Sequence, residues 1–108
     1  MSKADRIRQL NDRFRTTFQG GLVVMTAGVD ALPLDLKLQV IEAVRRFEKF
    51  DANSDPHGEH DFGSFELAAC KFFWKIDAYD AELHFGSEDP SDEAKTTRVL
   101  TIMLAEEY

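Results

Sequence analysis

The side chains best suited to chemistry lie in one short segment, residues 55–63. Two of the three histidines, His57 and His60, stand three residues apart there, and carboxylates occupy positions 55, 59 and 61. Histidine and carboxylate side chains are ligands for Zn, Mn or Fe. A divalent metal such as Zn or Mn, held by His57, His60 and Asp61, would leave Glu59 as general base for a metal-bound water. This pattern indicates a small metal-dependent hydrolase.

A structural loop is the interpretation of this segment that we prefer. Asp55 before Pro56 is suited to capping a turn, Gly58 permits a positive φ, and the histidines can bond backbone carbonyls. The histidine spacing also differs from the i,i+4 spacing of a metalloprotease helix. We therefore expect no cofactor and no catalytic residue, and we keep the metal-dependent hydrolase as the alternative.

The charge distribution favours a binding protein. Residues 1–50 carry nine Lys/Arg and six Asp/Glu, a balance of +3, whereas residues 51–108 carry four and fourteen, a balance of −10. An acidic half disfavours direct binding of nucleic acid. It suits a partner protein with a basic surface, such as a nuclease or another nucleic-acid enzyme. The partner-binding carboxylates that we expect are Glu88, Asp89, Asp92, Glu93, Asp55 and Glu59.

Helices are expected at three places. An apolar stripe repeats at spacings of three and four over residues 3–18, and the arginines at 6, 8, 13 and 15 lie mostly off that stripe. Pro33 opens a second helix that runs to about residue 50. Asp89 and Pro90 announce a third, whose apolar residues extend to Leu104. The third helix would be a place for an exposed apolar patch if the chain were a structural subunit of a larger complex.

Strands are expected between these helices. Residues 22–26 are β-rich and predict a buried strand, and residues 61–67 and 71–79 predict a β-hairpin with its turn near residues 68–69. The expected order is α-β-α-β-β-α. This is an α+β fold in which a small, mostly antiparallel sheet packs against three helices. At 108 residues the chain predicts a single domain, residues 1–108.

The remaining composition predicts a cytoplasmic protein. Cys70 is the only cysteine, so no intramolecular disulfide can form. The first residues lack the apolar core of a secretory signal, and no apolar run approaches the length of a membrane span. We therefore expect no contact with a membrane, and the sequence leaves the oligomeric state open.

Five blocks carry a family resemblance: IRQLNDRFR at 7–15, NSDPHGEHDFG at 53–63, FWKID at 73–77, GSEDP at 86–90 and LTIMLAEEY at 100–108. In this order they resemble the family called DUF3768, over almost the whole chain. The resemblance implies a mainly alphaproteobacterial family of unknown function. It also implies a mobile-element accessory role, including inhibition of a host defence system. It supplies no catalytic residues.

Overall fold

The computed structural model describes all 108 residues, as three α-helices and one four-stranded sheet. The helices are α1 (Lys3–Thr17), α2 (Ala27–Asp30) and α3 (Leu34–Arg45). The strands are β1 (Gly21–Met25), β2 (Phe62–Leu67), β3 (Cys70–Tyr79) and β4 (Thr97–Leu104). Two 3-10 turns, η1 (Glu93–Lys95) and η2 (Ala105–Glu107), flank β4. The α+β class expected from the sequence is confirmed.

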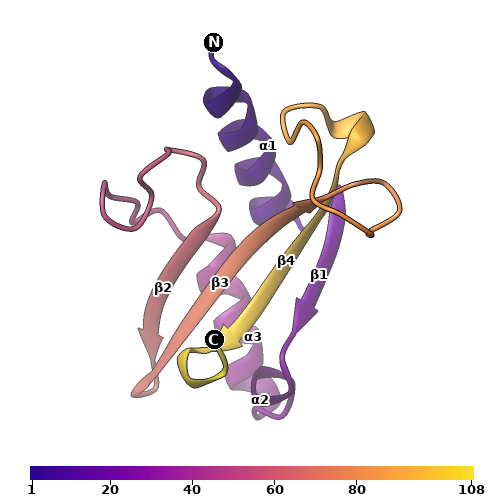
Figure 1. Cartoon of the computed structure of the whole chain (residues 1–108). Coiled ribbons are helices and arrows are strands. Elements are labelled where there is room, and N and C mark those ends of the chain that lie inside the picture. The colour runs from indigo at the N-terminus through magenta and orange to yellow at the C-terminus, as the bar shows by residue number, and fades with distance from the viewer.

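The sheet has the strand order β1-β4-β3-β2 (Figure 1). β2 and β3 form the expected antiparallel hairpin, and both turn residues, Ala68 and Ala69, have the positive φ that a two-residue hairpin turn requires. β3 pairs antiparallel with β4, whereas β1 pairs parallel with β4. The expectation of a mostly antiparallel sheet is therefore corrected: the sheet is mixed.

The expected third helix, from Asp89 to Leu104, is wrong. Residues 97–104 form β4, the strand that joins β1 to the hairpin. Its side chains alternate, with Leu100 and Ile102 buried against the helices and Thr101 between them on the other face. The β-branched residues of this segment favour a strand, and a central strand is apolar enough to imitate a helical stripe. The predicted cap at Asp89 starts no helix: its side chain accepts hydrogen bonds from Ser91, and Asp92 caps only the short turn η1.

The helices differ from expectation mainly at their ends. α1 forms as predicted and ends at Thr17, and the next residue, Phe18, has the left-handed conformation of a helix C-cap. Pro33 stands at the N-cap of α3, which ends at Arg45 rather than near residue 50. The four-residue α2 was not expected. It follows β1 directly and buries Val29 completely.

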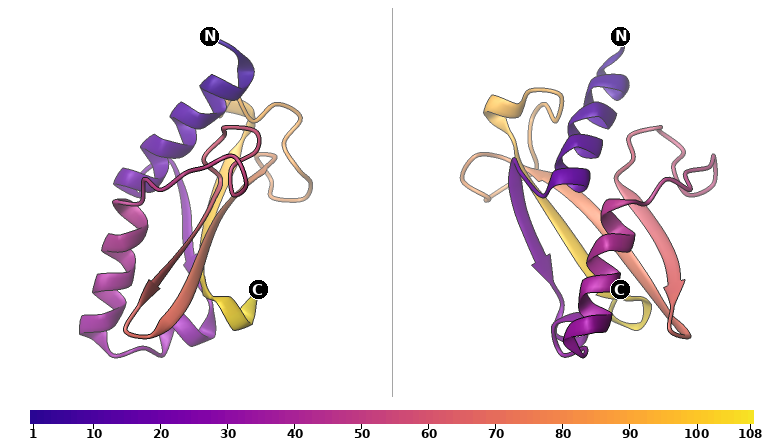
Figure 2. Two further views of the ribbon diagram at one scale, coloured as in Figure 1. Left: turned by 90° about the vertical axis from the view of Figure 1, so that its left-hand side faces the viewer. Right: turned by 180° about the vertical axis from the view of Figure 1, so that it is seen from behind.

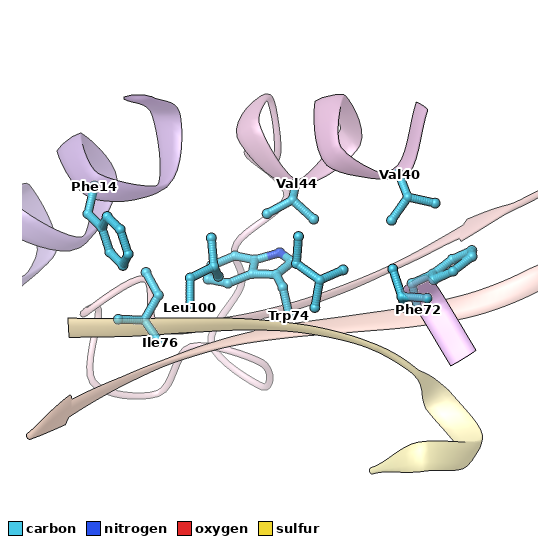
Figure 3. Close-up of a cluster of buried hydrophobic side chains, with 9 residues drawn as sticks. Phe14, Val40, Val44, Phe72, Trp74, Ile76 and Leu100 are labelled. Carbon is cyan, nitrogen blue, oxygen red and sulfur yellow. The ribbon is translucent and has the colours of Figure 1, made fainter. Parts of the chain in front are cut away.

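The core lies between the sheet and the two longer helices. Figure 3 shows Phe14 of α1 pointing toward Ile76 and Leu100, and Val40 and Val44 of α3 pointing down toward Phe72 and Trp74 of β3. The exposed fraction is at most 2% for Phe14, Val40, Val44, Phe72 and Trp74. Alternate residues of β3, namely Phe72, Trp74 and Ile76, thus face the core.

The helices cover only one face of the sheet. α1 and α3 lie on the same side, and the η2 turn lies on the other side near the C-terminus (Figure 2). β1 and β2 are the two edges. β1 is therefore not the buried strand that was expected, since Leu22 is 48% exposed and Val24 is 43% exposed. No helix has the length and apolar character needed to cross a membrane.

Candidate functional site

His60 is the centre of the most concentrated polar cluster. Its Nδ1 lies 2.8 Å from Asp12 Oδ1, and its Nε2 lies 3.5 Å from Asp55 Oδ2. The imidazole ring stacks on Phe50 with the ring centroids 3.6 Å apart and the planes 4° from parallel. The histidine is therefore held on both nitrogens and on one face of its ring.

The loop that carries His60 is folded around Asp55. The Asp55 carboxylate is 6% exposed and accepts hydrogen bonds from the backbone N–H groups of Glu59 and His60, each at 3.1 Å. Gly58 and His60 both have positive φ. The loop interpretation of residues 55–58 thus holds in two respects: Asp55 closes the turn and Gly58 adopts a conformation that most residues avoid. The expected bond from His60 to a backbone carbonyl is wrong, because its ring nitrogens contact the Asp12 and Asp55 carboxylates.

Helix α1 fastens this loop to the rest of the molecule. Asn11 donates a hydrogen bond to the backbone oxygen of Glu59 at 2.9 Å, and Arg8 donates one to that of Gly58 at 3.1 Å. Asn11 is also the acceptor for the buried Arg98 of β4, at 2.7 Å. Burial lowers the pKa of the Arg98 guanidinium. One amide side chain therefore links the loop, α1 and the central strand.

Arg15 lies behind the cluster. It is 3% exposed, donates to Asp12 at 3.2 Å and to the backbone oxygens of Val44 and Arg45, and packs over the rings of Phe50 and Trp74. Burial lowers the pKa of this guanidinium, and Asp12 opposes that shift. Arg15, Asp12, His60 and Asp55 thus form a continuous chain of polar contacts, in which the Asp12 carboxylate lies between the Arg15 guanidinium and the His60 ring.

The expectation that the arginines of the first helix face solvent is wrong for Arg15. Asn11 and Arg15 lie beside the apolar residues Leu10 and Phe14, so they continue the buried side of the helix. This position relative to the stripe is the signal that identifies them. Asp12 has no comparable signal, because its partner His60 is 48 positions away in the sequence.

The structure does not gather the expected metal ligands. No group of three or more His, Cys, Asp and Glu side chains is placed to hold a metal ion. Both ring nitrogens of His60 contact carboxylates, those of Asp12 and Asp55, and His57 is exposed. Asp61 is half-buried, and burial raises its pKa. These residues do not fit a resident metal, and the cluster around His60 fits a structural role.

The expected partner-binding carboxylates fall into two groups. Glu93 pairs with Arg6 and Arg13 of α1, Asp89 pairs with Lys3, and Asp55 is buried in the loop. The other three form no ion pair: these are Glu59, Glu88 and Asp92. Asp92 accepts a hydrogen bond from the backbone of Ala94. Part of the acidic half is therefore neutralised by the basic first helix.

These features define a small α+β domain whose polar cluster holds its loops in place. The protein-family comparison matches residues 25–107 to the protein of unknown function family DUF3768. The chain belongs to this family. No curated protein and no solved structure matches it.

Proposed function

We propose that the protein is a non-catalytic binding protein that docks a basic protein surface on its acidic end. The observation that carries the proposal is the position of two loops. Residues 51–61 contain four Asp/Glu and residues 80–93 contain six, and neither segment contains a Lys or Arg. The loops lie at the same end of the molecule, on either side of α1 (Figure 1).

The loops offer carboxylates that no cation neutralises. Beyond Glu59, Glu88 and Asp92, these are Asp51, Asp61, Asp80 and Glu82, none of which forms an ion pair. The loops themselves are braced by short-range bonds, since Asp51 and Asp80 each accept two backbone N–H groups. Fixed carboxylates lose less conformational freedom when they bind, which favours a docking surface.

A basic protein surface is the complementary partner. Opposite surface potentials accelerate encounter and fix the orientation of two proteins, and salt weakens this attraction. The surface where a nuclease or another nucleic-acid enzyme binds its substrate has this basic character. A bound acidic domain would block it, so the proposal includes inhibition of such an enzyme.

Affinity capture from host lysate, with charge-reversed variants, tests the proposal. Glu82→Lys/Glu88→Lys changes two exposed loop carboxylates whose side chains accept no hydrogen bond. Glu48→Lys/Glu106→Lys changes the net charge equally at exposed positions outside both loops. We expect a basic protein that is retained at low salt, released at high salt, and lost only with the loop variant. Equal capture by both variants, or no capture by the wild type, would refute the proposal.

A further inference from the structure

The edge strand β1 is unusually apolar for an open edge. It pairs on one side with β4 and has no strand on its other side. The eleven residues from Gln19 to Val29 include no charged side chain. Native proteins commonly protect a free edge with lysine, proline or a bulge, because unpaired backbone groups invite another strand. β1 has none of these protections.

The other edge of the sheet differs. β2 exposes Ser64 and the charged Glu66 on alternate positions, and Gly63 interrupts its apolar residues. On β1 the outward positions are Leu22 and Val24, which are 48% and 43% exposed. β1 is therefore the edge that an added strand would cover.

The free hydrogen-bonding groups of β1 can be identified. The backbone N–H of Thr26 donates to Ile102 of β4 at 3.0 Å. Because backbone groups alternate in direction along a strand, the N–H and C=O groups of Leu22 and Val24 also point toward β4. The N–H and C=O groups of Gly21, Val23 and Met25 therefore point away from the sheet.

This arrangement is complementary to itself in the antiparallel direction. With a two-fold axis beside Val23, Val23 faces its own copy and Gly21 faces Met25 of the other chain, as hydrogen-bonded pairs. The exposed Leu22 then lies opposite the exposed Val24 of the other chain, and each covers the other. The sheets of two chains would join into one continuous sheet with the helices of both on the same face.

We propose that β1 is the interface of a two-fold symmetric homodimer, formed by antiparallel β1–β1 pairing. The interface uses β1 and its flanks rather than the acidic loops, so it is independent of the binding proposed above. Leu22 and Val24 of this edge are among the exposed large hydrophobic residues, whereas the C-terminal helix that was expected to carry an apolar patch does not form.

Sedimentation and native mass spectrometry of the full chain, across a dilution series, test the dimer. We expect a dimer that dissociates on dilution. Val23→Pro removes an N–H that points away from β4, a position where an edge strand tolerates proline. We expect this variant to be monomeric with an unchanged far-ultraviolet circular dichroism spectrum.

A second pair of variants guards against misfolding of the proline variant. Leu22→Lys/Val24→Lys places ammonium groups opposite each other across the seam, and we expect the dissociation constant to rise at least about tenfold. Ser64→Lys/Glu66→Lys places two lysines at exposed positions of the β2 edge and should leave the dimer intact. A wild-type protein that is monomeric at every concentration would overturn the proposal. So would a dimer that the β1 lysines do not weaken.

Discussion

At position 63 the absence of a side chain makes room for the indole of Trp74. A Cβ atom there would overlap Trp74 Nε1 and would lie 2.8 Å from a ring carbon of Phe47. Both rings belong to the packed side of the sheet, and Trp74 is completely buried. The glycine is therefore required by close approach rather than by an unusual backbone conformation.

We predict that Gly63→Ala destabilises the protein by about 1–3 kcal/mol, the usual cost of overpacking a well-packed core. Urea denaturation followed by Trp74 fluorescence measures the change. Gly86→Ala is the matched control, since a Cβ at Gly86 meets no atom within 4 Å. A Gly63→Ala variant as stable as the control would show that the rings move aside without cost.

Asp61 makes stability depend on pH. Burial raises its pKa above the ordinary value of 3.8, and the charges of Asp55 and Asp77 add to the shift. The folded protein thus holds this proton more tightly than the unfolded chain. The resulting stabilisation is complete below 3.8 and is lost as the pH rises through the folded pKa.

We predict that Asp61→Asn gains stability relative to the wild type as the pH rises from below 3.8 to neutrality. Free energies of unfolding at several pH values measure the difference. Glu66→Gln removes one exposed negative charge from the same hairpin and serves as the control. A stability difference for Asp61→Asn that stays constant with pH would mean that this carboxyl ionises equally well in both states.

At the scale of elements, a hydrophobic pattern predicts the right helix or strand where the element buries only one of its faces, and it misleads where both faces are buried. The sequence predicts α1 and the strand β3 correctly because each of these elements faces the core on one side only. In β4, Met103 lies on the face of the sheet that carries no helix, yet it is only 3% exposed, so the strand buries apolar residues on both faces. Two-sided burial removes the alternation that distinguishes a strand from a helix.

The candidate site, too, could be predicted only in part from the sequence. The sequence identified residues 55–61 as an irregular loop with His60 in it, because turn residues are dense there. It could not identify Asp12 and Arg15 as the neighbours of that loop, because only the packing of α1 against the sheet brings them there. The difference between a metal site and a braced loop depended on those distant partners.

The C-terminal turn η2 holds the short helix α2 in place. Thr26 makes no side-chain cap for α2, and Glu107 instead accepts hydrogen bonds from the Thr26 hydroxyl and from the Gly28 N–H at 2.8 Å. The Thr26 hydroxyl is the main cause of a lowered pKa at Glu107, and the N–H groups of Leu104 and Gly28 lower it further. This stabilisation is present above the ordinary pKa of 4.5 and is lost as the pH falls through the folded value.

We predict that Glu107→Ala increases amide hydrogen exchange at Gly28 and in the rest of α2 while leaving β3 and β4 protected. Loss of a helix cap frees the orphan N–H groups of the first turn. The neighbouring Glu106→Ala is the control, because the Glu106 side chain is exposed and makes no hydrogen bond. Equal protection of α2 in both variants would assign its stability to the burial of Val29 instead.

At the scale of the whole molecule, the family match and the folded unit have different boundaries. The match begins at Met25, the last residue of β1, so α1 and most of β1 lie outside it. Yet α1 supplies the buried residues Leu10 and Phe14, which are 3% and 2% exposed. It also supplies Asn11, the acceptor for buried Arg98 and the donor to the loop that carries His60.

We therefore predict that a chain lacking residues 1–19 does not unfold cooperatively. Burial of Leu10 and Phe14 contributes about 1.5–3 kcal/mol each, a large part of the roughly 5–15 kcal/mol that stabilises a typical domain. Removing α1 also leaves the Arg98 guanidinium without the Asn11 acceptor. Thermal denaturation followed by circular dichroism measures the effect.

A chain lacking only residues 1–2 should lose the Ser2 cap of α1, at a cost of about 1 kcal/mol, and still melt sharply. A sharp transition in the chain lacking residues 1–19 would instead show that the residues shared with the family fold alone, with α1 as an addition to a complete core.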